Sequence, residues 1–379
     1  MPTALFTPIK VGSSLLRHRI VMSPLTRLRA DADHVPVPLT TEYYQQRASE
    51  GGLLVAEATF IAEDAGVYPS APGIYNDKQI EAWKNVTKAV HDKGGSIYLQ
   101  LWHVGRATVS AWIPGSKLPV SASAIAINGK NTAGMDYEVP RVLAVEEISQ
   151  ITQTYADAAK NAISAGFDGV EIHGANGYLI DQFINTSSNI RTDQYGGSIE
   201  NRTRFALEVV EGVSKAIGEE RTAIRLSPWS GFQDMKDDTP YETWGYLVNQ
   251  LQERHPRLAY LHFIEPRDQF INDGNPTADR GDAVEGYSTE PFHKAWKGPF
   301  ITAGGYTTIP KRAFKAAEKL ENTLVAFGRS FIANPDLPLR IKNDWPLNDY
   351  NRSTFYGGGS VGYTDYPFYN PDTAHDIKN

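Results

Sequence analysis

Residues 168–185 read DGVEIHGANGYLIDQFIN, a short apolar strand that ends in a cluster of polar and aromatic side chains. His173, Asn176 and Tyr178 fall within six positions, where the strand should stop. A polar cluster beyond a buried strand offers hydrogen-bond donors to a small ligand. The rest of the chain has to show which fold surrounds this cluster and what the ligand is.

Apolar runs of strand length recur along the chain, and each is followed by turn residues and a helical pattern. They are residues 19–23, 53–58, 96–102, 169–173, 223–227, 259–264, 300–303 and 324–327. Runs of this kind are typical of strands buried on both faces in a parallel sheet. Helical spacing of apolar residues lies between them, in 77–93, 146–165, 200–217, 239–253 and 310–319.

Eight β-then-α units without a break in composition predict one α/β domain over residues 1–379, a (β/α)8 TIM barrel. A doubly wound sheet is the alternative, but it usually opens with a glycine fingerprint, and the first strand is followed only by PLTRLRA. We expect residues 1–18 to form a hairpin lid over the bottom of the barrel. Two long loops, 102–142 and 266–290, would lie on the C-terminal face, where barrel active sites are built.

The charge balance is mild, because 37 basic and 44 acidic residues give a formal net charge of −7. No block of like charge stands out, which argues against nucleic acid or an anionic membrane as the main partner. The absence of cysteine excludes disulfides, thiolate metal sites and a cysteine nucleophile. With no signal-peptide pattern and no apolar run of membrane-span length, we expect a cytoplasmic monomer or homodimer.

Two polar side chains stand inside apolar strands. Gln100 lies in IYLQLW, where a buried amide either bonds a neighbouring strand or reads the edge of a ligand. Arg225 lies in AIRLS, and a buried guanidinium needs an anion. That anion is either a barrel carboxylate, for which Glu171 is a candidate, or an electron-rich ligand.

The last two strands end in glycines. Gly304 and Gly305 follow the seventh strand, and Gly328 and Arg329 follow the eighth. Loops at these two positions of a barrel frequently form a phosphate site, because glycine lets backbone N–H groups approach and arginine adds charge. The pattern therefore predicts a phosphate grip rather than two tight turns alone.

His173 is open to three interpretations, namely metal ligand, general base or satisfied core histidine. Its spacing to Asn176 matches no usual metal motif, so we expect no metal. Tyr178, with a reference pKa of about 10, is suited to donate a proton at neutral pH. A phosphate grip, an arginine and an amide for a flat ring, and donors above it together predict flavin mononucleotide (FMN) with a substrate stacked on it.

The chain resembles the Old Yellow Enzyme family of FMN-dependent ene-reductases over essentially its whole length, in the manner of a classical fungal member. The resemblance is carried by these motifs: LFTPIKVG, RIVMSPLTRLRA, QRASEGGLLVAEAT, QLWHVGR, EIHGANGYLIDQFINTSSNIRTDQYGGSIENRTRF, RLSPW, AGGYT, FGRSFIANPDLPLR and FYGGGSVGYTDYPFY. The block EIHGANGYL…YGGSIENR is the most specific of them.

This resemblance implies a role for each matching residue. Thr26 would bond the flavin O4, Gln100 would read the pyrimidine edge, and Arg225 would lie by N1 and O2. Ala58 replaces a glycine of many relatives beside the ring. The phosphate would be held by Gly305, Gly328 and Arg329, with Gly304 beside them. On the substrate side, the implied set is His173 and Asn176 as donors to its oxygen, Tyr178 as proton donor, Tyr356 as pocket wall, and Trp102, Phe232 and Phe270 as shape-setters.

The resemblance further implies that NADPH reduces the flavin and that an α,β-unsaturated carbonyl or nitroalkene is then reduced. Alternatives stay open at this stage. They are a specialised reductase or isomerase of secondary metabolism, a non-catalytic flavin- or steroid-binding barrel, and a flavin-free lyase. The sequence does not identify the substrate, its stereochemistry, or a preference for NADPH over NADH.

Overall fold

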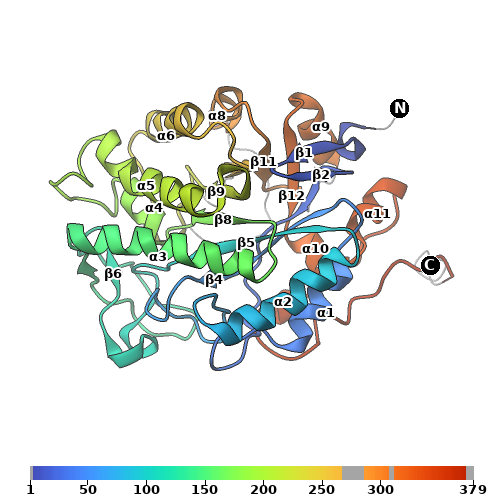
Figure 1. The fold of residues 1–379 in the computed structure, drawn as a ribbon, viewed down its shortest axis with the longest axis horizontal. Helices are drawn as coiled ribbons and strands as arrows, with labels where there is room; N and C mark the ends of the chain where they lie inside the picture. Colours follow the sequence, from blue (N-terminus) through green and yellow to red (C-terminus); the bar gives the residue numbers. More distant parts are fainter. Residues whose placement is uncertain (1–2, 267–285, 307–310, 373–379) are drawn as a thin grey trace.

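A closed barrel of eight parallel strands forms the centre of the molecule (Figure 1). The computed structural model describes residues 3–266, 286–306 and 311–372. In order around the barrel the strands are β10 (Tyr260–Ile264), β11 (Phe300–Ala303), β12 (Thr323–Phe327), β3 (Ile20–Met22), β4 (Leu53–Phe60), β5 (Ser96–Trp102), β8 (Gly169–Gly174) and β9 (Thr222–Leu226). The predicted TIM barrel is confirmed, and each of the eight apolar runs forms one strand.

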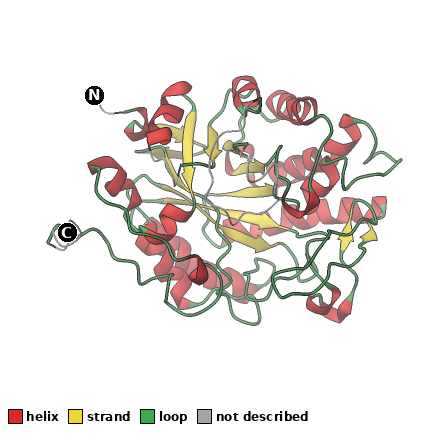
Figure 2. Ribbon diagram, turned by 180° about the vertical axis from the view of Figure 1, so that it is seen from behind, coloured by secondary structure: helices red, strands yellow, loops and turns green. Residues whose placement is uncertain are grey.

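Helices cover the outside of the barrel, as Figure 2 shows from behind. They are α1 (Pro38–Arg47), α2 (Asp77–His91), α3 (Val145–Ser164), α4 (Leu179–Ile184), α5 (Ile199–Ile217), α6 (Pro240–Arg254), α8 (Glu290–Ala295), α9 (Lys311–Lys319), α10 (Arg329–Ala333) and α11 (Leu337–Asn343). Short 3-10 turns are η1 (Ala4–Phe6), η2 (Ser110–Trp112), η3 (Pro114–Ser116), η4 (Glu219–Arg221), η5 (Phe232–Asp234) and η6 (Arg352–Thr354). Four predicted helices match α2, α3, α5 and α6 within two residues at each end, and α9 covers the described part of the fifth.

Local chemistry fixes where the longer helices begin and end. The side chain of Asn76 caps α2 by accepting from the backbone N–H of Gln79, and Ser198 caps α5 by accepting from that of Asn201. Gly218, at φ 96°, ends α5 because a residue without Cβ takes this backbone conformation at no steric cost. Apolar residues at helical spacing then turn one face of each helix onto the barrel.

An antiparallel hairpin, β1 (Ile9–Val11) and β2 (Ser14–Leu16), precedes the barrel. Its buried side chains, Val11 and Leu16, belong to the same apolar cluster as Tyr98 and Tyr260 of the barrel interior. The hairpin lies against Glu220, immediately before β9 begins, so it covers the N-terminal end of the barrel. The predicted lid over the bottom is therefore confirmed.

The opposite, C-terminal end of the barrel carries the long loops. The loop after β5 includes a two-stranded sheet, β6 (Val120–Ser121) and β7 (Arg141–Val142). The chain after α11 contains only the short η6 turn among its described residues. No described helix is long and apolar enough to cross a membrane.

We predict that one glycine of the barrel tolerates no side chain. A Cβ on Gly169 would lie 2.3 Å from Tyr98 Cε1 and 2.5 Å from the carbonyl oxygen of Arg221. Gly169→Ala should therefore destabilise the protein by about 1–3 kcal/mol in urea unfolding, because an overpacked core has to shift.

Gly245 is the matched control, because it lies within α6 and a Cβ there meets nothing within 4 Å. Gly245→Ala should leave stability unchanged or raise it by up to about 1 kcal/mol. Equal effects of the two substitutions would contradict this account of the packing.

Candidate functional site

A carboxylate at the centre of the barrel joins two neighbouring polar side chains. Gln100 Nε2 donates to Glu171 Oε1 at 2.7 Å, and His262 Nδ1 lies 2.7 Å from Glu171 Oε2. All three side chains are at most 2% exposed. Because a carboxylate only accepts, it fixes Gln100 with its amide nitrogen towards Glu171 and requires the proton of His262 on Nδ1.

The charge at this site is held by Glu171 and Arg225. Burial acts to raise the pKa of Glu171, but the hydrogen-bonded His262 and the charge of Arg225 lower it below its usual value. Burial lowers the pKa of His262, which leaves a neutral ring that donates to the carboxylate. Of the two anions considered for Arg225, Glu171 attracts it electrostatically, but no hydrogen bond between the two side chains occurs within the described residues. Among the described residues the hydrogen bonds of Glu171 go to Gln100 and His262.

Several buried polar nitrogens near the barrel mouth have no hydrogen-bond partner within the described ranges. They include Nε of Arg225, Nδ1 of His173 and Nε2 of His262. Register pairs both His173 and His262 with Arg225 on adjacent strands, so the three side chains belong to one level of the barrel. A buried polar group without a partner costs on the order of 1–3 kcal/mol, which points to a polar ligand above them.

The turn after β8 has an unusual backbone. Asn176 has φ 58°, and Gly177 follows at φ 74°. Ser227 Oγ accepts from Asn176 N at 2.8 Å, Asp181 Oδ2 accepts from Gly177 N at 2.8 Å, and Gln182 Nε2 donates to the oxygen of Gly177 at 2.8 Å. A non-glycine residue persists at positive φ only where its surroundings over-determine it, as these three side chains do.

The turn delivers Tyr178 to an aromatic group at the end of β5 and β8. The ring centroid of Tyr178 lies 4.8 Å from that of His173 and 4.9 Å from that of Trp102. Burial raises the pKa of Tyr178, and the phenols of Tyr356 and Tyr137 raise it further. Tyr178 therefore remains protonated at neutral pH.

The predicted phosphate residues lie together where β11, β12 and β3 end. Gly304 and Gly305 have φ 119° and 83°, and a Cβ on Gly328 would lie 3.2 Å from Leu25 Cδ2. Arg329 donates from Nη1 to the hydroxyl of Tyr350 at 3.2 Å. Because these glycines carry no Cβ, no side chain of their own covers the backbone at the ends of β11 and β12.

Thr26 and Ala58 come from the first two barrel strands. Glu57 Oε2 accepts from the backbone N–H of Arg27 at 3.2 Å, so the neighbours of Thr26 and Ala58 are bonded directly to each other. Thr26 is half-buried beyond the end of β3, and Ala58 is 3% exposed on β4. Phe232 lies in η5, and Phe270 falls outside the described residues.

Sequence reasoning missed four supporting side chains. His262 could have been found, because it occupies a strand as Arg225 does, in YLHFI. Asp181 and Gln182 are polar residues in the buried α4, which is a weak signal. Tyr68, stacked on Trp102 at 5.3 Å, gave none, because only the path of its loop brings it there.

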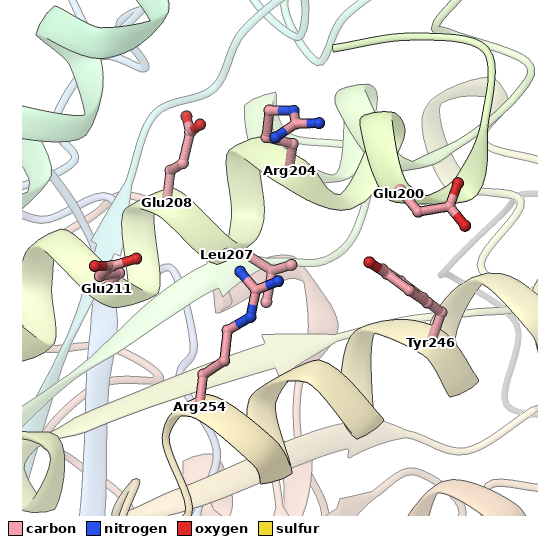
Figure 3. Close-up of a pocket in the computed structure, with 7 residues that line it drawn as sticks. All are labelled: Glu200, Arg204, Leu207, Glu208, Glu211, Tyr246 and Arg254. Atoms are coloured by element: carbon pink, nitrogen blue, oxygen red, sulfur yellow. The ribbon is translucent and has the colours of Figure 1, made fainter. Parts of the chain in front are cut away.

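A separate hollow of about 320 Å³ lies between α5 and α6 (Figure 3). It is lined by Glu200, Arg204, Leu207, Glu208, Glu211, Tyr246 and Arg254. These helices belong to the outer layer, so the hollow is not part of the site at the barrel mouth. Within the described ranges, no cluster of three or more His, Cys, Asp or Glu residues could hold a metal ion.

Comparison with known proteins places this site in a family. Residues 4–348 match the NADH:flavin oxidoreductase / NADH oxidase family. Flavin oxidoreductase hxnT of Emericella nidulans is 48% identical over 383 residues, covering 96% of this chain and 97% of that protein. 12-Oxophytodienoate reductase 1 of Oryza sativa subsp. japonica is 48% identical over 365 residues, covering 96% and 93%.

Solved structures agree with the sequence comparison. Morphinone reductase in complex with tetrahydroNAD superposes with a TM-score of 0.86 at 43% identity, covering 98% of this chain and 99% of that one. The chain belongs to the Old Yellow Enzyme family. It is therefore an oxidoreductase of a flavin-dependent family.

The residues at the barrel mouth fit the FMN of the Old Yellow Enzyme family. Arg225 Nε is buried and meets no hydrogen-bond partner in the part of the chain that the structure describes, as expected of a donor to a ring with acceptor atoms. Gln100, with its Nε2 turned to Glu171, keeps Oε1 to accept from a ring N–H. The glycine turns and Arg329 have the chemistry of a phosphate grip.

We predict that Glu171 controls FMN affinity through Gln100 and His262. Glu171→Gln removes a charged acceptor from two buried hydrogen bonds, each worth on the order of 1.5–3 kcal/mol. Titration of the apoprotein with FMN should show a Kd raised by about 10- to 100-fold. Glu147→Gln, at a partly buried carboxylate on the outer helix α3 that pairs with Arg141, is the control and should not change the Kd. An unchanged Kd in Glu171→Gln would refute this role.

We also predict a pH dependence from Asp181. Burial raises its pKa from 3.8 to about 7, so between about pH 4 and pH 7 the folded protein keeps a proton that the unfolded chain releases. This group therefore makes the protein less stable as pH rises through that interval. Asp181→Asn removes the effect, and its stability relative to the parent should rise from pH 5 to pH 8 in urea unfolding.

The same comparison cancels other titrating groups. Glu57, whose pKa burial raises to about 7, is present in both proteins and drops out of the difference. A constant stability difference between Asp181→Asn and the parent across this pH range would show that Asp181 is ionised in the folded protein.

Proposed function

We propose that this protein is an NADPH-dependent ene-reductase that reduces α,β-unsaturated carbonyl compounds or nitroalkenes. The observation that carries the proposal is the joint position of His173, Asn176 and Tyr178 at the end of β8, beside Arg225, whose buried Nε has no hydrogen-bond partner among the described residues. When bound, FMN supplies the hydride-transfer chemistry. The chain's own residues bind and orient both molecules and supply the proton.

Four groups are assigned to the flavin ring and one set to its phosphate. Gln100 and Arg225 would face the pyrimidine edge, where the positive charge of Arg225 would stabilise electron density. Thr26 and Ala58 would lie beside the ring. The phosphate set is Gly304, Gly305, Gly328 and Arg329.

His173 and Asn176 are assigned to the substrate oxygen. Burial lowers the pKa of His173, and the charge of Arg225 lowers it further, so the ring is neutral and donates through one N–H. Donors fixed in a site that excludes water stabilise developing negative charge on an oxygen. The over-determined turn at Asn176 keeps this donor in place before the substrate arrives.

Tyr178 is assigned as the proton donor to the α-carbon of the alkene. Its raised pKa keeps the proton on the phenol oxygen until a carbanion-like centre develops beside it. Trp102, Tyr356 and Phe270 are assigned to the pocket wall. The use of NADPH rests on the family resemblance, and the lack of cysteine is compatible with the cytoplasmic location that we include in the proposal.

We predict that Tyr178→Phe separates the two halves of the reaction. The variant should still bleach its flavin absorbance with NADPH, because no proton from Tyr178 is needed there. Recovery of the colour on adding cyclohexenone should slow by about 10²–10⁴-fold, as expected for loss of a general acid. Stopped-flow absorbance measures both steps.

His173→Ala is the companion variant. It should weaken substrate binding and slow the alkene step by about 10²–10³-fold, because one donor to the oxygen is lost. If neither variant affected alkene reduction, Tyr178 and His173 would not have the roles assigned to them. A parent protein that binds FMN but reduces no alkene would instead be a flavin-binding barrel without this activity. A purified protein that takes up no FMN would contradict the proposal altogether.

A further inference from the structure

Three arginines hold the chain segment that carries Tyr356. This segment, residues 354–363, begins at the last residue of η6 and includes a run of three glycines, Gly357 to Gly359. It forms no regular helix or strand after η6, so its backbone groups need partners elsewhere. Arg27, Arg29 and Arg47 supply them.

Arg29 uses its whole guanidinium for this purpose. Nε donates to Gly359 O at 3.1 Å, Nη1 to Phe355 O at 3.2 Å, and Nη2 to Thr354 O at 3.0 Å and Val361 O at 3.2 Å. Nη1 also donates to the oxygen of Arg27 at 3.0 Å. A guanidinium has five N–H donors, and all five here meet backbone carbonyls.

The other two arginines also donate hydrogen bonds to backbone carbonyls of this segment. Arg27 donates to Phe355 O at 2.9 Å and Gly362 O at 2.8 Å, and its own carbonyl accepts from Gly357 N at 3.0 Å. Arg47 donates to Tyr363 O at 3.1 Å.

A stacked tyrosine pair supports the three cations. The rings of Tyr43 and Tyr363 lie 4.1 Å apart at 11°. Arg29 lies over the Tyr363 ring at 4.4 Å, and Arg47 over the Tyr43 ring at 3.8 Å. Cation–π contacts in a desolvated setting add to the hydrogen bonds.

Two links connect the segment to the reaction site, one through Arg27 and one through Tyr356. Arg27, next to Thr26, donates its backbone N–H to the buried Glu57, next to Ala58. Tyr356, between Phe355 and Gly357, influences the phenol of Tyr178 although its own side chain is 61% exposed. An exposed side chain in a glycine-rich loop keeps a fixed place only if its backbone is held.

We propose that Arg29, together with Arg27, is a positioning residue that sets substrate affinity by fixing the backbone on either side of Tyr356. The inference rests on the proposed function, because it takes Tyr356 as a wall of the alkene pocket. It differs in kind from the assigned roles, since Arg29 acts on the substrate only through the segment that it holds.

The test compares Arg29→Gln and Arg29→Lys with the parent holoenzyme. Arg29→Gln should raise the KM for cyclohexenone about tenfold, with kcat within about twofold, because the pocket wall is lost and the donors are intact. Arg29→Lys keeps the charge but not the five-donor fork, so its KM should lie between those of the other two. Arg141→Gln, at an exposed arginine, should match the parent.

A double-mutant cycle then identifies the route. If Arg29 acts through Tyr356, Arg29→Gln should have little further effect on KM in a Tyr356→Ala background. Independent, additive effects on KM would overturn the proposal, as would an unchanged KM in Arg29→Gln.

Hydrogen exchange separates this proposal from the proposed function. Amides of residues 354–363 should exchange about tenfold faster in Arg29→Gln than in the parent, with the barrel strands unchanged. If the parent reduces no alkene but exchange in residues 354–363 is still faster in Arg29→Gln, the ene-reductase assignment fails, while the finding that Arg29 holds this segment remains. Unchanged exchange of this segment in Arg29→Gln would show that Arg29 does not hold the segment, whatever the activity of the protein.

Discussion

The site depends on the buried, ionised carboxylate of Glu171 and on the groups that stabilise its charge. A charge inside an apolar barrel is stable only if its oxygens are bonded and a cation is near, and Glu171 has Gln100, His262 and Arg225 for this. The consequence is orientation. The amide of Gln100 and the proton of His262 can each take one arrangement only. The polar floor of the site is therefore set before a ligand arrives.

The turn after β8, by contrast, is a strained part of the site. Asn176 is held at positive φ, which costs free energy, and Ser227, Asp181 and Gln182 hold the backbone on both sides of it. Asp181 itself is buried at a cost that raises its pKa to about 7. The strained turn and the buried Asp181 lower the stability of the folded protein, but they hold His173, Asn176 and Tyr178 in place at the end of β8. A site held in this way needs little reorganisation during reaction.

Much of this arrangement could be predicted from the sequence. The strands and the main helices were predicted correctly, because apolar periodicity is a local property of the chain. Strand ends then identified His173, Arg225 and Gln100. The partners of Arg225 could not be deduced in this way, because whether it meets Glu171 or a ligand depends on side-chain geometry between strands. Tyr68 was missed because loop paths leave no periodic signal.

The sequence by itself determined the barrel and the chemical types at its mouth, since both follow from residue order within each strand and turn. Only the tertiary structure decided which groups share partners. Gln100 and His262 meet on one carboxylate because β5 pairs directly with β8, and the curved barrel wall brings β10, on the far side of β9, within reach of β8. Arg29 meets carbonyls 325 to 332 positions away for a similar reason. Hydrogen bonds depend on distance and angle in space, and these exist only once distant segments have packed.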